Sequence, residues 1–337
     1  MKKKSGKFMC IISQEQNSLL TISQTQLESA TRLAKILNLN IDLKIKRDDL
    51  YPQTGGGSKS RKIIYIVRDA LQKSCDALVT NGSPQSNHAR ATAIMAANLG
   101  LRCHLVIVLD PLMPKVITGN LLLMKMSGAS IEFCEKHDLA TQMDHAIRQL
   151  KSEGFKPMYV WGGGHGLPGV KAFVDAAMEA RQQCGEWIPD YVFLASGTGS
   201  TQAGLTIGYS DLNTKIIGIS VARDSIRGSN VIRESIEEFQ KNSEFTINSC
   251  EIIFRDDWVS GGYSQTNPDL LDLIRQSAKA GYYFDPTYSG KAMQGLVEMV
   301  RKGEISEGSK VLFWHTGGIM NLISSKDFLT GGIRKDN

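Results

Sequence analysis

The sequence Gly55-Gly56-Gly57-Ser58-Lys59-Ser60-Arg61-Lys62 places a lysine at the end of a glycine-rich turn, directly before a helical pattern. Glycines let a backbone approach a planar ring or a phosphate closely, and a primary amine can condense with a carbonyl to form a Schiff base. Lys59 is therefore the candidate attachment point for a carbonyl-bearing cofactor. A nucleotide-hydrolase phosphate loop would need glycines where Gln53 and Ser58 stand, so that class is excluded. The remaining alternative is a glycine-rich connector with a solvated lysine.

A second corner between a strand and a helix follows. The apolar run 77–79 leads into Thr80-Asn81-Gly82-Ser83-Pro84-Gln85-Ser86-Asn87, and an alanine-rich helical pattern begins at His88. Ser86 and Asn87 are expected where the free amides of a helix N-terminus point, which suits the carboxylate of a substrate. Ser86 also makes sense as a simple helix N-cap.

A third corner repeats this design. The strand Tyr191-Val192-Phe193-Leu194-Ala195 leads into Ser196-Gly197-Thr198-Gly199-Ser200-Thr201-Gln202-Ala203-Gly204, which opens another helical pattern. Backbone amides and small hydroxyls at such a corner form a neutral cup that can hold a phosphate. The predictions of a phosphate cup and of a Schiff-base lysine in the same chain support each other.

Taken together, these segments resemble the D-cysteine desulfhydrase and aminocyclopropane-carboxylate deaminase family. The similarity covers nearly the whole chain in the family's order. It is carried by Lys46-Arg47-Asp48-Asp49-Leu50, the glycine-rich loop with Lys59 and Lys62, residues 85–90 and 196–204, Gly262-Tyr263, Asp285-Pro286-Thr287-Tyr288-Ser289-Gly290-Lys291 and His315-Thr316-Gly317-Gly318. The resemblance implies pyridoxal-phosphate chemistry on the fold of the tryptophan synthase β subunit, known as PLP fold type II.

The resemblance also implies a role for each candidate residue. Lys59 would hold the cofactor and move protons, and Lys62 would face the phosphate, with a solvent-facing helix lysine as the alternative. Asn87 would bind the ring hydroxyl, and Ser86 would bind the substrate carboxylate and relay a proton. The phosphate would lie against Gly197, Thr198, Gly199, Ser200 and Thr201. The substrate would contact Gln85, Ser86, Asn87, Tyr263 and Tyr288, and the two tyrosines would be catalytic. Ser289 and Thr316 would face the ring nitrogen. His88 and His315 are interpreted as structural groups.

Ser289 and Thr316, the two residues expected at the ring nitrogen, indicate which reaction is catalysed. The deaminase branch has a glutamate in place of Ser289 and an apolar residue in place of Thr316. Neutral hydroxyls leave the ring nitrogen largely unprotonated, which weakens the electron sink. That suffices for β-elimination with a good leaving group on Cβ, so the sequence predicts a carbon–sulfur lyase that converts D-cysteine to pyruvate, ammonia and sulfide.

Several alternatives stay open at this point. Cysteate or a chlorinated or O-acetylated alanine could be the substrate of the same elimination, and cyclopropane-carboxylate deamination uses the same scaffold. A serine or threonine dehydratase is another lyase, although its loop has a Ser-x-Gly-Asn-His-type pattern where this chain has Gln85-Ser86-Asn87-His88. From a different class, the chain could be a cofactor-binding homologue without turnover.

Alternation of strand and helix patterns predicts an α/β fold with two lobes, each a mostly parallel sheet wrapped by helices. Helical patterns include 26–37, 62–73, 88–99, 139–152, 169–184, 269–280 and 290–302, and strand patterns include 77–79, 103–108, 158–160, 191–195, 216–219 and 310–314. By analogy with the fold, residues 1–65 and 169–337 form a large cofactor-binding lobe and residues 66–168 a small inserted one. Gly162-Gly163-Gly164-His165-Gly166 would be a crossing or hinge, or else a plain turn.

Composition fits this fold and excludes other classes. The chain has 337 residues, 42% of them hydrophobic, with six scattered cysteines and a net charge of +5 that is spread along the sequence. This pattern disfavours nucleic-acid binding, a zinc site or another metal site, and a disulfide framework. No apolar run approaches the length of a membrane span, and the run after Met1-Lys2-Lys3-Lys4 is too short for a signal peptide. We expect a cytoplasmic homodimer without a membrane partner.

Overall fold

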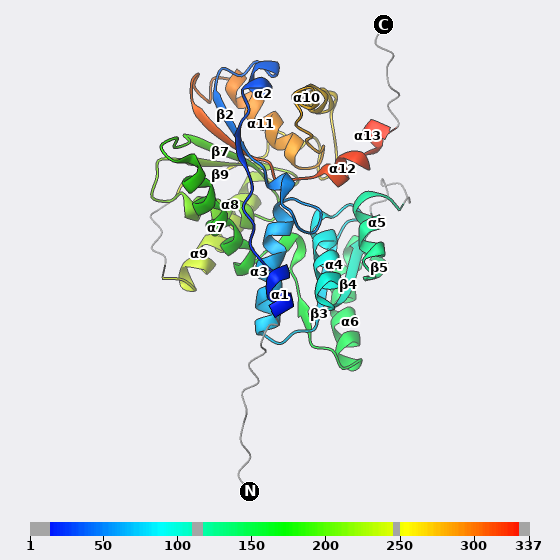
Figure 1. Cartoon of the computed structure of the whole chain (residues 1–337). Helices are drawn as coiled ribbons and strands as arrows, with labels where there is room; N and C mark the ends of the chain where they lie inside the picture. Colours follow the sequence, from blue (N-terminus) through cyan, green and yellow to red (C-terminus); the bar gives the residue numbers. More distant parts are fainter. Residues whose placement is uncertain (1–13, 110–116, 245–249, 330–337) are drawn as a thin grey trace.

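The computed structural model of the chain describes residues 14–109, 117–244 and 250–329. Two sheets, each wrapped by helices, form two lobes that lie one above the other in Figure 1. This arrangement confirms the predicted α/β fold class. The expectation about a signal peptide concerns residues that lie outside the described ranges.

The larger sheet has six strands in the order β1-β2-β10-β7-β8-β9. All neighbours are parallel except β1, which pairs with β2 in the antiparallel sense. The strands are β1 (Leu27–Ser29), β2 (Asp42–Lys46), β7 (Tyr191–Ser196), β8 (Lys215–Ser220), β9 (Ile253–Arg255) and β10 (Lys310–Trp314). Within the described residues, the last strand, β10, therefore lies inside the sheet, between β2 and β7.

The smaller sheet has four parallel strands in the order β5-β4-β3-β6, all from one continuous part of the chain. These strands are β3 (Ala77–Gly82), β4 (Arg102–Val108), β5 (Ser130–Cys134) and β6 (Pro157–Tyr159). Alternate side chains face opposite sides of the sheet. Ala77 and Val79 pack against helix α6 (Leu139–Ser152), whereas Leu78 joins the core formed with α3 (Ser58–Gln72) and α4 (Asn87–Leu99).

Helices cover the faces of both sheets (Figure 1). They are α1 (Gln14–Leu19), α2 (Thr31–Ile36), α3 (Ser58–Gln72), α4 (Asn87–Leu99), α5 (Gly119–Met126), α6 (Leu139–Ser152), α7 (Leu167–Cys184), α8 (Ser200–Gly208), α9 (Ser225–Lys241), α10 (Pro268–Ala278), α11 (Ser289–Arg301), α12 (Ile319–Ile323) and α13 (Lys326–Leu329), with short 3-10 turns η1 (Asp48–Leu50), η2 (Lys136–Asp138) and η3 (Gly162–Gly164). One hydrophobic core runs from Leu78 through α3 and α7 to Trp314, and thus joins the two sheets.

Helix α3, which carries Lys59, is fixed by buried ion pairs. Arg61 Nη2 lies 2.8 Å from Asp48 Oδ1, and Arg61 Nη1 lies 2.7 Å from Glu179 Oε2 on α7. Lys46 on β2 also pairs with Glu179, and the indole of Trp314 donates to Asp48 Oδ2 at 2.9 Å. Removing one partner of a buried pair leaves an uncompensated charge, so these contacts strongly define where the first turn of α3 lies.

The helical pattern at the start of the chain differs from the structure. Residues 26–37 have a helical pattern, but β1 occupies Leu27–Ser29 and the helix α2 begins only at Thr31. Pairing with β2, in which Leu27 lies opposite Lys46, overrides the local helical preference. The proposed lobe boundaries stay predictions; they fall inside α3 and near the start of α7.

The cysteines and helices add two facts. Cys75, Cys103, Cys134 and Cys184 are free and buried, and Cys250 is half-buried. Among the described helices, none has both the length and the apolar character that crossing a bilayer requires.

Candidate active site

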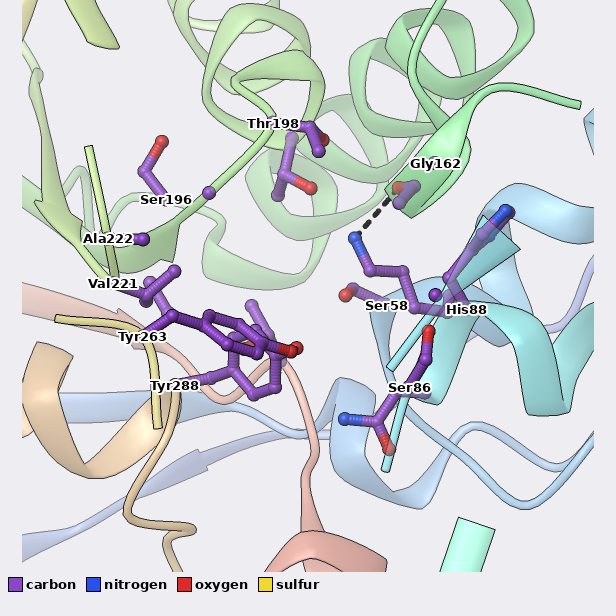
Figure 2. Close-up of a pocket in the computed structure, with 18 of the residues that line it drawn as sticks. Ser58, Ser86, His88, Gly162, Ser196, Thr198, Val221, Ala222, Tyr263 and Tyr288 are labelled. Atoms are coloured by element: carbon purple, nitrogen blue, oxygen red, sulfur yellow. Dashed lines mark hydrogen bonds between the residues drawn. The ribbon is translucent and has the colours of Figure 1, made fainter. Parts of the chain in front are cut away.

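A cavity of about 440 Å³ lies between the lobes, at the carboxyl ends of strands from both sheets. Its lining comes from the start of α3, the corners after β3, β7 and β8, the turn η3 and the C-terminal part of the chain. The lining residues are 57–59, 81–83, 86–88, 162–163, 195–199, 201, 221–223, 263, 288 and 316–317. In Figure 2, Ser86 and His88 lie on one side of this cavity, and Tyr263 and Tyr288 lie across from them. The three corners singled out in the sequence thus meet at one place.

Lys59 lies in the first turn of α3, behind a turn that only glycine permits. Gly57 has a φ of +92°, and a Cβ on it would lie 2.9 Å from the carbonyl oxygen of Thr316. The Lys59 amine donates a hydrogen bond to the Gly163 carbonyl at 2.9 Å. Burial lowers the pKa of Lys59 to about 8, because the charged amine is poorly solvated there. The amine is therefore partly neutral near physiological pH, as attack on a carbonyl requires.

This pKa gives a testable pH dependence. In apoprotein prepared by removing the cofactor, reattachment of pyridoxal phosphate through Lys59 is expected to rise roughly tenfold per pH unit below about pH 8 and to level off above it. The reason is that only the neutral amine reacts. The rate of appearance of the cofactor absorbance band, followed from about pH 6 to about pH 10, measures it, with a free lysine derivative as the control. A rate that keeps rising to the pKa of free lysine would contradict the assignment.

The corner after β7 forms a cup at the N-terminus of α8. Gly199 is in the left-handed region with a φ of +85°, and the helix begins at Ser200 with amides that have no partner within the helix. The Lys62 amine donates to Ser200 Oγ at 2.7 Å and lies 5.4 Å from the centre of the Phe173 ring.

Lys62 is fully buried, and no carboxylate lies within 4.0 Å of its amine in the part of the chain that the structure describes. Burial and the neighbouring Lys59 lower the pKa of this amine. A cation in such a place is stabilised by an anion, and a phosphate at the N-terminus of α8 would supply one. The residues present therefore fit a phosphorylated cofactor.

The corner after β3 presents two polar side chains to the cavity. Ser86 caps α4, and its hydroxyl oxygen accepts the Ala89 amide at 3.1 Å, which leaves its proton to donate elsewhere. The Asn87 oxygen Oδ1 accepts from Arg90 Nη1 at 3.2 Å and from Asn120 Nδ2 at 3.1 Å. Asn87 therefore offers its Nδ2 donor to the cavity, which suits an acceptor such as a ring oxygen.

Tyr263 and Tyr288 form the opposite wall (Figure 2). Their hydroxyls are hydrogen-bonded to each other, and their rings pack edge to face with centroids 5.9 Å apart. Burial, and then the neighbouring Tyr263, raise the pKa of Tyr288 well above that of free tyrosine. Tyr288 therefore keeps its proton at neutral pH. The sequence placed the two tyrosines in one site, and the structure brings them into contact.

Four candidate residues do not line the cavity: Lys62 and Ser200, which are hydrogen-bonded to each other, and Gln85 and Ser289. The Gln85 side chain donates to the Thr118 carbonyl at 3.0 Å and accepts the Asn120 amide at 3.0 Å, and it does not line the cavity. Ser289 is fully buried behind the cavity wall, where its hydroxyl donates to Asp285 Oδ1 at 2.8 Å. The expected contacts of Gln85 with substrate and of Ser289 with the ring nitrogen are thus not formed by these side chains, because each is held by a nearer partner. Thr316 does line the cavity.

His88 and Arg223 line the cavity, although sequence reasoning gave neither of them a role in the site. His88, interpreted as structural, lies beside Lys59 and Lys62; its Nε2 is 2.9 Å from Thr80 Oγ1, and burial lowers its pKa to about 3. It is therefore a neutral ring. Arg223, in the turn after β8, donates to the Gly197 carbonyl in the corner after β7. A strand end followed by a lone arginine gave no distinctive signal.

An amine of lowered pKa, a helix N-terminus that fits a phosphate and the capped N-terminus of α4 meet in one cavity, an arrangement that fits a cofactor-dependent enzyme of the tryptophan synthase β fold. The profile of the family described as pyridoxal-phosphate dependent enzyme matches residues 19–317, and the chain belongs to this family. Its cofactor is pyridoxal phosphate.

Two relatives identify the branch of the family. The chain is 34% identical to the D-cysteine desulfhydrase of Klebsiella pneumoniae over 303 residues, which cover 87% of this chain and 91% of the relative. It is 31% identical to an ACC deaminase homologue of known crystal structure, with a TM-score of 0.83, covering 94% of this chain and 99% of that one. Threonine deaminase isoform 2 from Solanum lycopersicum shares the fold, at 17% identity and a TM-score of 0.61 over 87% of this chain and 78% of its own. The protein is a pyridoxal-phosphate-dependent lyase of the D-cysteine desulfhydrase and ACC deaminase type.

Proposed function

We propose that this lyase eliminates the sulfur of D-cysteine and yields pyruvate, sulfide and ammonia. The observation that carries the proposal is the chemistry of the cavity wall. No aspartate or glutamate occurs among the lining residues that the structure describes, whereas Lys59 and Arg223 are both present. A protonated ring nitrogen is stabilised by a carboxylate partner, so this wall favours the unprotonated ring.

The buried Asp285 does not alter this conclusion. Its two carboxylate oxygens accept the amides of Thr287, Tyr288 and Ser289 and the Ser289 hydroxyl, at 2.8 to 3.0 Å. It does not line the cavity. Thr316, whose hydroxyl is neutral, does line the cavity. A weak electron sink serves an elimination with a good leaving group better than the opening of a cyclopropane ring.

The site's own residues divide the remaining work. Bound pyridoxal phosphate supplies the electron sink for the charge that develops on the substrate Cα. The Lys59 amine attaches the cofactor and, once released, can carry a proton to or from Cα, since its pKa is about 8. The Ser86 hydroxyl and the N-terminal amides of α4 bind the substrate carboxylate. One hydroxyl of the Tyr263 and Tyr288 pair donates its proton to the other, and the second hydroxyl can donate its own proton into the cavity.

A panel of substrates tests the proposal. The holoenzyme, incubated with D-cysteine, L-cysteine, D-cysteate, L-cysteate, β-chloro-D-alanine and aminocyclopropane carboxylate, is expected to form pyruvate and sulfide from D-cysteine. It is expected to form no 2-oxobutyrate from the cyclopropane substrate. The Lys59→Ala variant corrects for sulfide released by free cofactor. Efficient formation of 2-oxobutyrate, or a preference for cysteate, would overturn the assignment to D-cysteine. The homodimer and the cytoplasmic location also stay predictions, and sedimentation of the holoenzyme tests the first.

A further inference from the structure

Lys291 is a buried lysine that the proposed chemistry does not use. It lies on the first turn of α11, three residues after Tyr288, and is fully buried. Its amine donates to the carbonyls of Val259 and Gly262, both at 2.7 Å. These two carbonyls belong to the loop between β9 and α10 that carries Tyr263.

No acidic group pairs directly with this amine within the described ranges. The carboxylate on its own segment, Asp285, is saturated by backbone amides and by the Ser289 hydroxyl. Burial lowers the pKa of Lys291 to about 8. Placing an amine there costs desolvation energy, which its bonds to the two carbonyls offset. The strongest described contacts of the Lys291 amine are therefore with the Tyr263 loop.

The loop itself needs such support. Ser260 and Ser264 have φ values of +56° and +61°, in the left-handed region, and Gly261 and Gly262 between them are also positive. Residues other than glycine hold this conformation only where the surrounding structure fixes it. A hydrogen bond from Asn267 Nδ2 to Ser260 Oγ, at 2.8 Å, is a second support.

We propose that Lys291 is a positioning residue that holds the loop of Val259 to Ser264 against α11, so that Tyr263 meets Tyr288 across the cavity. Helix α11 then fixes both tyrosines, Tyr288 through its own N-terminus and Tyr263 through the Lys291 amine. The assignment rests on the proposed function to the extent that the tyrosine pair takes part in turnover. Lys291 itself does not line the cavity, so it acts through Tyr263.

The test compares Lys291→Met with Arg301→Met in the holoenzyme. Methionine matches the apolar stem of lysine as far as Cε and has no donor, and Arg301 is an exposed cation on the same helix. Hydrogen exchange in residues 259–264 is expected to accelerate in Lys291→Met alone, and kcat/KM to fall about 10²-fold, as for a misplaced active-site group. Thermal unfolding and cofactor occupancy check folding. Should the methionine variant fold poorly, hydrogen exchange and kcat/KM are measured instead in Lys291→Gln, which keeps an N–H donor on a shorter stem.

A double-mutant cycle with Tyr263→Phe shows whether Lys291 acts through the tyrosine. The loss of kcat/KM in the double variant is expected to match the larger of the losses in the two single variants, because both substitutions disable the same contact. Additive losses, or unchanged exchange in residues 259–264, would overturn the proposal. If the unmodified protein turns over no amino acid of the panel, the proposed function fails, and the exchange measurement still decides the role of Lys291.

Discussion

Replacing Lys59 by Ala is expected to remove the covalent link to pyridoxal phosphate and to reduce turnover by roughly 10⁴-fold or more. The physical reason is that the Lys59 amine lies in the cavity with a pKa of about 8, poised for reaction. Reduction of the holoenzyme with borohydride, followed by peptide mapping, measures the link. Turnover of D-cysteine measures the activity.

The matched control for this change is Lys73→Ala, at the C-terminal end of the same helix. Lys73 is exposed and pairs with Asp69, so both cofactor linkage and activity are expected to survive its loss. Attachment of the cofactor to Lys62 would contradict this prediction most directly, because Lys62 is a second buried amine near Lys59 whose pKa is also lowered. Mapping of the reduced cofactor to Lys62 in the unmodified protein would show that the roles of the two lysines are reversed.

Replacing Thr198 by Asp is expected to cause the second large effect, a loss of cofactor affinity. Thr198 lies in the cup before α8, where the structure best suits a phosphate. A carboxylate about 4 Å from the phosphate costs about 4 kcal/mol at an effective dielectric constant of 20, which is roughly 10³-fold in affinity. Equilibrium dialysis of the apoprotein against pyridoxal phosphate measures the change.

Thr198→Asn separates charge from size in this experiment. Asparagine has nearly the shape of aspartate and no charge, and space is tight here, since a Cβ on Gly163 would lie 2.6 Å from Thr198 Cγ2. The asparagine variant is expected to retain most of the affinity that the aspartate variant loses. Equal affinities for the two variants would place the phosphate elsewhere in the cavity.

Sequence patterns predicted the parts of the site in which the backbone dictates the chemistry. The glycines before Lys59, the serine cap of α4 and the small residues before α8 each occupy a strand-to-helix corner, and parallel strands bring such corners together. The fold class followed from the same alternation. The structure accordingly places Lys59, Ser86 and Thr198 on one cavity.

The site contacts that the sequence predicted wrongly depend on side-chain partners that are either remote in sequence or only a few residues away. Gln85 is held by Thr118 and Asn120, more than thirty residues away. Ser289 follows Tyr288 directly, yet its hydroxyl bonds to Asp285 because a helix N-terminus keeps that carboxylate within reach. No local pattern tells which of two adjacent residues faces a cavity and which faces a buried acid.

The position of β10 in the larger sheet has a consequence for biosynthesis. Lys310–Trp314 pairs with β2 on one side and β7 on the other, so the sheet has a gap until residues 310–314 have left the ribosome. The smaller sheet draws all its strands from the stretch between Ala77 and Tyr159 and can assemble much earlier. Contacts of such high sequence separation slow folding and prolong the exposure of apolar strand faces. A nascent chain stalled before Lys310 would therefore carry a finished small sheet beside an incomplete cofactor lobe, and chaperone binding is expected to concentrate on that interval.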